Sequence, residues 1–377
     1  MEYDTEDRIN HRKQNRVLVV YASDYVGISP GGIQSYIRIM DRDVPENLDI
    51  VYLGIKGEYA GFPPNQDKMI GLDVKPILGS WNLGFLFALR KFRFSDYDIV
   101  LCHRAETALF IQFFTRKPTF LVLHGGTLNA FRSRNYLFGA IYPLIELLAS
   151  FFSSETACVN PEATFILTRI LTTIKQAPLV VDQNIFFTDD DNKRDGIFLI
   201  GRLEKEKEFG KALDILSSTV VGANRILQIH IIGDGSQRAK LANHAARLNL
   251  DVIFHGMQSS EKVAELLKFH GKYLVITSKF EGFPIVAIEA ISCGVTVLAL
   301  KAPGVGKNLS TIGVKIFETP ASMAKFISLN DSQKANGFLP EEKLDISFEK
   351  SAQNYWQIVT SIIDGSNKGK RGPKSNV

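Results

Sequence analysis

Short apolar runs alternate with stretches of mixed polarity along most of this chain, and the alternation indicates its architecture. The apolar runs are rich in Val, Ile and Leu, and they include Arg16–Ser23, Thr119–Gly126, Ile197–Leu203, Leu227–Gly235 and Tyr273–Thr277. Continuous runs of this kind are typical of strands that a parallel sheet buries on both faces. Because the stretches between them have helical character, the pattern predicts an α/β fold with parallel sheets.

The chain is long enough for two domains, and its clearest break in composition lies near the middle. With 377 residues and 45% hydrophobic content it can bury two cores, given ~100–200 residues per domain. The polar run Thr188–Asp195 is the expected linker. We predict α/β domains over residues 1–187 and 188–345, then a helix over 346–365 that packs toward the first domain. The basic tail, residues 366–377, should be disordered.

The most informative segment is Ser278–Gly294, which places Glu281 and Glu289 eight residues apart around an expected helix start. Pro284 suits the first turn of a helix, where its missing N–H costs nothing. Gly282 lets the backbone approach a ligand, and the free N–H groups after Pro284 would form an anion site. Eight residues of regular helix rise about 12 Å. The carboxylates would therefore hold hydroxyls at the two ends of an elongated ligand with an anionic middle.

The spacing alone also fits a helix start with one solvated glutamate and one capping glutamate. The segment resembles the E-x7-E signature of the family 4 retaining glycosyltransferases, which have the GT-B fold of two Rossmann-like domains facing a central cleft. The resemblance implies that Glu281 contacts hydroxyls of the transferred sugar and that Glu289 holds the ribose of the nucleotide. It also implies that backbone amides between them meet the distal phosphate, around Phe283, Pro284, Ile285 and Val286.

A second matching segment supplies cations for a diphosphate. Within and after Ile197–Leu203, Arg202 and Lys207 have the spacing of the family's G-R-L-x3-K-G element. Negative charge grows on the leaving diphosphate as the glycosidic bond breaks, so cations that face it stabilise the transition state more than the ground state. The arginine can fork two phosphate oxygens, and the lysine acts as a point charge. Glu208 replaces the family's second glycine, and membership of a solvated charge run is the alternative role for Lys207.

Two further strands in this half resemble those beside the family's donor pocket. Leu227–Gly235 ends in Gly233 and Gly235, which allow a sharp turn at the carboxyl end of a strand, where open parallel sheets bind ligands. Val252–Gly256 resembles the strand whose following loop frames the base, so Met257 would lie against the base. An ordinary connecting loop is the alternative for each segment.

The amino-terminal half carries complementary signals. Gly31 and Gly32 open a helical run after the first strand, and by resemblance their amides lie near the diphosphate and the sugar. His124 lies at the carboxyl end of the apolar run Thr119–Gly126, and the resemblance implies that it reaches a hydroxyl of the transferred sugar. A loop histidine satisfied by the backbone is the alternative. His103 is a second, less specific candidate at the same face.

Two apolar stretches raise the question of membrane contact. Tyr136–Ser153 contains Pro143 and Glu146, so it is a poor span, and we expect a core helix. Trp81–Phe94 mixes large apolar side chains with basic ones. Core packing with a basic outer face is favoured slightly over contact with an anionic bilayer, although relatives that use lipid-linked acceptors favour peripheral membrane contact.

Cysteine usage and charge bound the compartment and the partners. Cys102, Cys158 and Cys293 have no paired spacing, and residues 1–15 are charged and polar, unlike a signal sequence. We therefore expect free buried thiols and a cytoplasmic location, with the cytoplasmic face of the membrane as its extension. The net charge of +4 is too small to indicate nucleic acid as a partner.

These residues and the resemblance predict a retaining glycosyltransferase that moves a hexose from a nucleoside diphosphate sugar, preferably a UDP-sugar, to a saccharide or lipid-linked acceptor. No cofactor and no metal are expected, because Arg202, Lys207 and a helix amino terminus neutralise the diphosphate. The Asp triplet at 189–191 fits a charged linker better than a metal motif.

Other activities rank lower. A sugar-nucleotide epimerase with the same fold and a catalytically inactive scaffold are the alternatives. A nicotinamide dehydrogenase is disfavoured, because neither half shows Gly-x-Gly-x-x-Gly between a strand and a helix. The family's usual N-G-V-D before the linker reads Leu179-Val180-Val181-Asp182 here, which is a departure from the pattern.

Overall fold

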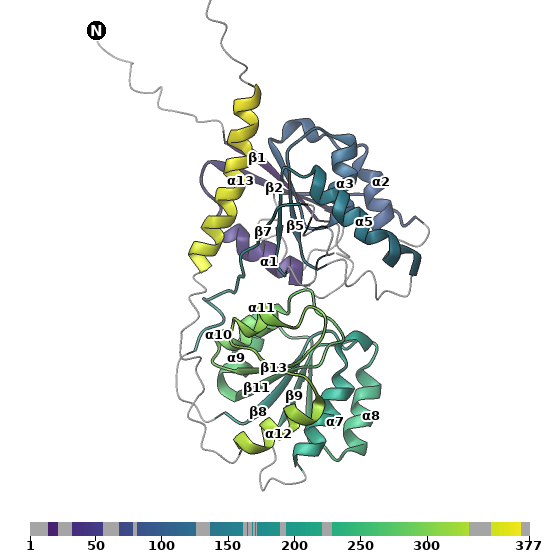
Figure 1. Cartoon of the computed structure of the whole chain (residues 1–377), viewed down its shortest axis with the longest axis vertical. Helices are drawn as coiled ribbons and strands as arrows, with labels where there is room; N and C mark the ends of the chain where they lie inside the picture. Colours follow the sequence, from purple (N-terminus) through teal and green to yellow (C-terminus); the bar gives the residue numbers. More distant parts are fainter. Residues whose placement is uncertain are drawn as a thin grey trace, which may run out of the picture.

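The computed structural model describes residues 14–21, 32–55, 68–77, 81–125, 136–160, 164, 168, 170, 172–188, 194–220, 228–331 and 348–370. Their strands form two separate sheets, which Figure 1 shows as two lobes, one above the other. Every strand pairing is parallel. The α/β architecture expected from the apolar runs is confirmed.

The first sheet has seven strands in the order β3-β2-β1-β4-β5-β6-β7. They are β1 (Asn15–Val20), β2 (Leu48–Ile55), β3 (Met69–Leu72), β4 (Ile99–Cys102), β5 (Thr119–Leu123), β6 (Glu155–Cys158) and β7 (Ile174–Gln176). The helical segments of this half are α1 (Gly32–Met40), η1 (Asp41–Asp43), α2 (Trp81–Leu89), η3 (Phe94–Asp96), α3 (Ala105–Phe114) and α5 (Tyr136–Phe152).

The second sheet has six strands in the order β10-β9-β8-β11-β12-β13. They are β8 (Gly196–Ile200), β9 (Ile229–Ile232), β10 (Val252–Gly256), β11 (Gly271–Ile276), β12 (Thr296–Leu300) and β13 (Lys315–Phe317). Its helical segments are η5 (Lys205–Lys207), α7 (Phe209–Val220), α8 (Arg238–Arg247), α9 (Ser260–His270), α10 (Ile285–Ser292), α11 (Lys307–Ser310) and α12 (Pro320–Asp331). The change of sheet falls between β7 and β8, whereas the boundary at residue 187 stays a prediction because residues 189–193 lie outside the described chain.

Local sequence explains both kinds of element. All four residues of β4 are apolar and inaccessible to solvent, as a strand covered on both faces requires. Helix α9 begins where the Ser259 hydroxyl accepts a hydrogen bond from the Lys262 amide at 3.3 Å, which satisfies one of the unpaired donors of the first turn. Its buried residues Val263, Leu266 and Leu267 recur at helical spacing against the sheet.

The strand order reverses once in each sheet, and these reversals position the candidate site. In the first sheet β1 lies between β2 and β4, and in the second sheet β8 lies between β9 and β11. Connections from the two neighbours leave toward opposite faces, so a crevice opens at the carboxyl ends of the strands. The loops after β8 and β11 border the crevice of the second sheet.

The last helix, α13 (Phe348–Lys370), packs on the first lobe (Figure 1). Tyr355 and Trp356 are buried in the first core, and the Trp356 indole donates to the Met40 carbonyl at 3.0 Å. The helix continues to Lys370, so residues 366–370 are helical and not disordered as expected. Within this last part of the helix, the Ser366 hydroxyl donates to the Ile362 carbonyl at 2.9 Å.

Helix α5 corrects a second expectation. It forms over the predicted residues and buries Tyr142 and Ala149 in the first core, but its other face is apolar and exposed: Ile141 and Leu144 are 46% and 54% exposed while Glu146 is fully buried. The Glu146 carboxylate therefore faces the protein interior, and apolar side chains of the helix face outward. Composition alone does not reveal this orientation. None of the described helices is long and apolar enough to span a bilayer.

Candidate active site

Glycines at the ends of β8 and β9 allow the two backbones to meet. Gly233 has φ of +132°, and a Cβ added there would lie 2.0 Å from the Gly201 carbonyl oxygen, so no larger residue fits. The loop after β8 therefore stays close to the sheet edge. Its Arg202 side chain is 67% exposed and pairs with Glu206 at 3.1 Å. This places an exposed guanidinium on the turn that ends in Lys207.

Lys207 and Glu281 join the loops after β8 and β11. The Lys207 ammonium lies 2.7 Å from the Glu281 carboxylate, and the Ser278 hydroxyl donates to the same oxygen at 2.6 Å. The two charged side chains are only 22% and 10% exposed. A carboxylate this buried needs such a partner, because burying an unpaired charge is costly. The structure thus brings together the residues that the sequence assigned to the diphosphate and to the sugar.

The departure at Glu208 has a structural explanation. This residue has φ 48° and ψ 38°, the left-handed conformation that glycine adopts without strain. The backbone turn typical of a glycine is therefore kept with a glutamate in its place. Its carboxylate contacts Lys211 and lies 3.6 Å from the Lys279 ammonium. Lys207 consequently points back to Glu281 despite the missing glycine.

The loop that begins at Glu281 is held by close backbone contacts. A Cβ on Gly304 would lie 1.7 Å from the Glu281 carbonyl oxygen, and a Cβ on Gly282 would lie 2.3 Å from the His124 carbonyl oxygen. Only glycines allow these approaches. The contact of Gly282 with His124 shows that the two lobes touch at the candidate site.

Asn160 ties the lobes together, although no sequence motif pointed to it. Its fully buried side-chain amide, beyond the end of β6, donates to the Gly282 carbonyl at 2.6 Å and to the Gly304 carbonyl at 2.9 Å. A polar residue shortly after a buried strand of the first sheet was the available signal. Its partners lie more than a hundred positions away in the chain, so sequence alone could not name them.

Two histidines face each other at the carboxyl ends of β4 and β5. His103 Nδ1 and His124 Nε2 lie 3.0 Å apart, and the Tyr36 ring meets the His124 ring edge-on at 5.0 Å between centroids. Burial lowers the pKa of His124 to about 3. Burial and the neighbouring His124 also lower the pKa of His103 well below its usual value. Both rings are therefore neutral at physiological pH, and one donates its N–H to the other.

Glu289 lies on α10 near groups from other elements. Burial raises its pKa to about 7, while Arg38 of α1 opposes the shift and Asp182 adds to it. Arg38 also contacts the Ser260 hydroxyl at 3.4 Å across the lobes. Glu289 is thus a carboxylate whose protonation is poised near neutral pH.

The other predicted donor residues surround the start of α10. Pro284 is the residue before the helix, which begins at Ile285, one position later than expected, and no side chain caps it. Phe283 and Ile285 pack against the first core, and Phe283 and Val286 pack against the second. These contacts place the uncapped amides of α10 between the lobes.

The remaining predicted residues are more scattered. Gly235 has φ of +155° and lies against the Leu203 carbonyl, and Met257, after β10, is 42% exposed. Gly32 begins α1, and Gly31 lies outside the described residues. The described positions of this group lie at the ends of strands or helices, and their roles in donor binding stay predictions.

Metal and pocket chemistry add little to this site. Within the described ranges, no group of three or more His, Cys, Asp or Glu residues could hold a metal ion. Metal independence stays a prediction.

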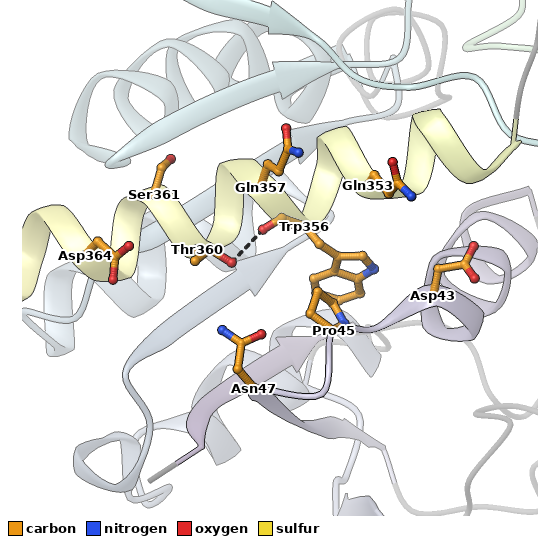
Figure 2. A pocket seen from close by; sticks show the side chains of 9 residues that line it. All are labelled: Asp43, Pro45, Asn47, Gln353, Trp356, Gln357, Thr360, Ser361 and Asp364. Atoms are coloured by element: carbon orange, nitrogen blue, oxygen red, sulfur yellow. Dashed lines mark hydrogen bonds between the residues drawn. The ribbon is translucent and has the colours of Figure 1, made fainter. Parts of the chain in front are cut away.

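A surface hollow of about 440 Å³ lies between α13 and the turn before β2 (Figure 2) and is lined by Asp43, Pro45, Asn47, Gln353, Trp356, Gln357, Thr360, Ser361 and Asp364. Its lining has no cation and includes none of the predicted site residues, so it does not suit a diphosphate.

The chain is similar to known proteins in sequence and in fold. Residues 181–346 match the family described as glycosyl transferases group 1. The chain is 32% identical over 98 residues to the amylovoran biosynthesis glycosyltransferase AmsD of Erwinia amylovora, which is 26% of this chain and 27% of that protein. It is 27% identical over 203 residues to the lipopolysaccharide 1,6-galactosyltransferase of Escherichia coli, covering 49% and 53% of the two chains. The matches thus span about half the length of these relatives or less.

The structural similarity covers nearly the whole chain. Sucrose-phosphate synthase from Thermosynechococcus elongatus superposes with a TM-score of 0.68 at 14% identity, over 95% of this chain and 98% of that chain. Anabaena HepE in complex with UDP-glucose superposes with a TM-score of 0.64 at 16% identity, over 94% and 98%. The expected GT-B fold is confirmed by these neighbours.

Proposed function

We propose that this chain is a retaining glycosyltransferase, because residues 181–346 match the family described as glycosyl transferases group 1. It moves a hexose from a nucleoside diphosphate sugar, preferably a UDP-sugar, to a saccharide or lipid-linked acceptor. Its role is in polysaccharide or lipopolysaccharide biosynthesis, which the activities of the two sequence relatives support.

The contact between Lys207 and Glu281 carries this proposal. It joins the two loops at the strand-order reversal of the second sheet. Glu281 lies in the loop that leads into α10. A cation, a carboxylate and the amides of a helix start that no side chain caps are groups that suit a sugar diphosphate. The amides and Lys207 suit the phosphates, and Glu281 suits hydroxyls of the sugar.

Charge development gives each group its role in the reaction. As the nucleoside diphosphate departs, further negative charge develops on the distal phosphate. Arg202 and Lys207 therefore stabilise the transition state more than they stabilise the ground state. Neutral His124 has a ring nitrogen suited to a hydroxyl of the sugar. We propose that the acceptor attacks the anomeric carbon of the sugar on the same face from which the diphosphate leaves. None of the named site residues is assigned as a covalent nucleophile. No metal enters this scheme.

The donor and the compartment rest on further support. One structural neighbour, Anabaena HepE, is a complex with UDP-glucose, which favours a uridine donor here. All three cysteines are buried and none is in a disulfide, which supports a reducing, cytoplasmic compartment.

A donor panel tests the activity. The chain is incubated with UDP-, GDP- and ADP-hexoses and simple saccharide acceptors, and nucleoside diphosphate release is measured with and without a chelator. Release from a UDP-hexose, unchanged by chelator and with the anomeric configuration kept by NMR, is the expected result. Conversion of the free nucleotide sugar without an acceptor would indicate an epimerase. Binding without any turnover would indicate an inactive scaffold.

Two matched substitutions test the assignment of the glutamates. Glu289→Gln should weaken the free nucleoside diphosphate as much as the whole donor, because the ribose keeps its structure throughout the reaction. Glu281→Gln should lower turnover and leave affinity for the free nucleotide nearly intact. Calorimetry on both variants decides the matter. An equal loss of nucleotide affinity, or a larger loss for Glu281→Gln, would reverse the assignment.

A further inference from the structure

The outer face of α5 has an unusual distribution of polarity. The helix has 17 residues, and its single charged residue, Glu146, is fully buried. Among the side chains of α5 that the structure describes, the large exposed ones are apolar: Ile141, Leu144, Phe151 and Phe152 are 46%, 54%, 66% and 60% exposed. An ordinary surface helix shows the opposite arrangement, with charged residues outward. This face is therefore built to be covered.

The carboxyl-terminal ends of α2 and α3 extend the apolar surface. Phe87 is 53% exposed, Phe113 is 82% exposed and Phe114 is 48% exposed. The Gln112 amide of α3 donates to the Ala149 carbonyl and to the Ser153 hydroxyl, at 3.3 Å and 2.8 Å, so the ends of α3 and α5 are adjacent. Figure 1 shows α2, α3 and α5 side by side on one flank of the upper lobe. We call this surface the aromatic flank: Phe87, Phe113, Phe114, Ile141, Leu144, Phe151 and Phe152.

Basic residues accompany the aromatic flank. The Arg90 guanidinium lies 5.9 Å from the Phe87 ring centroid and 5.6 Å from that of Phe114. Lys91 and Arg116 are exposed just beyond the ends of α2 and α3. Between α2 and β4, Arg93 pairs with Asp96 at 3.5 Å. The charge beside the apolar surface is therefore predominantly positive.

We propose that the aromatic flank and its basic residues bind the surface of an anionic lipid bilayer. Contiguous apolar patches mark interaction sites, whereas single exposed apolar residues do not. A protein partner would favour an interface depleted of lysine. Aromatic and aliphatic side chains flanked by Lys and Arg instead match a bilayer, where apolar groups enter the acyl boundary and cations meet the head groups.

The proposed contact has a geometric consequence. The strands of the first sheet end toward the second lobe, and α5 begins on the chain shortly after His124. The carboxyl-terminal end of α5, with Phe151 and Phe152, lies beside the start of β5, where the Thr119 amide donates to the Ser154 hydroxyl at 3.3 Å. A bilayer on the aromatic flank would therefore meet the first lobe away from the strand ends that border the crevice. Bilayer binding itself requires no donor and no catalysis, so it fails or succeeds separately.

Vesicle sedimentation tests the proposal on the full chain. Vesicles of phosphatidylcholine alone are compared with vesicles that also contain phosphatidylglycerol. Phe151→Ser/Phe152→Ser should weaken binding to the anionic vesicles about tenfold, because two rings lose burial. Lys91→Gln and Arg116→Gln should each weaken it about fivefold. Phe269→Ser, at a phenylalanine 58% exposed on α9 of the other lobe, is the matched control and should bind normally.

The outcomes separate the possible occupants of the flank. The substituted side chains are exposed, so thermal unfolding should be unchanged, and this measurement guards against misfolding. Absence of vesicle binding, or equal binding to neutral and anionic vesicles, would overturn the proposal. So would a wild-type dimer in ultracentrifugation that Phe151→Ser/Phe152→Ser converts to a monomer, because the flank would then join two copies of the chain.

Discussion

Glu208 shows how a single residue can keep a turn at a cost. Its left-handed φ of 48° strains any side chain with a Cβ, by about 1 kcal/mol or more. The turn must be kept because Lys207, directly before it, reaches Glu281. The strain therefore persists at a position where it supports the candidate site.

We predict that Glu208→Gly is more stable than Glu208→Ala by about 1 kcal/mol. Both substitutions remove the carboxylate near Lys211 and Lys279, so only the backbone conformation differs between them. Urea unfolding of the two variants measures the difference. Equal stabilities would mean that residue 208 is not strained.

The raised pKa of Glu289 predicts a specific dependence of stability on pH. Burial raises this pKa from 4.5 to about 7, so between these values the folded protein keeps a proton that the unfolded chain has lost. Stability then falls as the pH rises through this window. Glu289→Gln removes the effect and should gain up to about 3 kcal/mol relative to the parent between acid and pH 8.

Unfolding free energies at the two ends of the window measure this gain. Glu261→Gln is the control, because the pKa of Glu261 is lowered by hydrogen bonds to its own backbone amide and to Ser259. This pKa shift has the opposite sign to that of Glu289, so Glu261→Gln should not gain stability relative to the parent as the pH rises. A difference between Glu289→Gln and the parent that stays constant with pH would contradict the raised pKa of Glu289.

At the scale of elements, the site depends on how the loops after β8 and β11 are joined. Lys207 and Glu281 make this connection with side chains that are only 22% and 10% exposed. Removing only the lysine leaves a buried carboxylate beside the Ser278 hydroxyl, without the cation that balances its charge. The charge pair therefore fixes the relative position of two loops that belong to different strands.

A double-mutant cycle measures this connection. Lys207→Ala should lower the free energy of unfolding by about 2 kcal/mol. The double variant Lys207→Ala/Glu281→Gln should lose less than the sum of the two single losses, with a coupling energy of about 1–3 kcal/mol. The exposed pair Lys262–Glu265 is the control, with an expected coupling below about 0.5 kcal/mol. A nucleoside diphosphate should reduce the Lys207–Glu281 coupling, because the phosphate competes for the lysine. A coupling energy as small as that of the control pair would show that the Lys207–Glu281 pair does not fix the relative position of the two loops.

The same scale separates what the sequence reveals from what it hides. Arg202, Lys207 and Glu281 lie in loops directly after apolar strands, and a local pattern is enough to place them at one sheet edge. The Lys207–Glu281 contact follows from the reversal of strand order between β8 and β11, which no local pattern specifies. The outward apolar face of α5 was also hidden, because hydropathy does not say which side of an apolar helix meets the core.

At the scale of the whole molecule, contacts between the lobes complete the site. Asn160 and Arg38 come from the first half of the chain and reach the loop of Glu281 and helix α9, respectively. Such contacts depend on how two separately folded sheets meet. Two domains and a crevice could therefore be predicted from the sequence, whereas the residues that cross the crevice could not.

Asn160 provides the most direct test of this arrangement. Its amide bridges the Gly282 and Gly304 carbonyls in a fully buried position, so Asn160→Ala leaves two acceptors unpaired. We expect a loss of about 2 kcal/mol in unfolding free energy. We also expect a larger radius of gyration by small-angle X-ray scattering, because the loop of Glu281 is no longer tied to the first lobe.

Turnover should fall in the same variant, while affinity for the free nucleotide changes little. In the proposed reaction, nucleotide binding uses groups of the second lobe, whereas transfer needs His124 and Glu281 on the same sugar. Asn160 ties the Glu281 loop to the first lobe. Asn330→Ala is the matched control, because the Asn330 side-chain amide donates to the Phe326 carbonyl within its own helix. An Asn160→Ala variant with unchanged scattering and full turnover would show that the lobes keep their arrangement without this bridge.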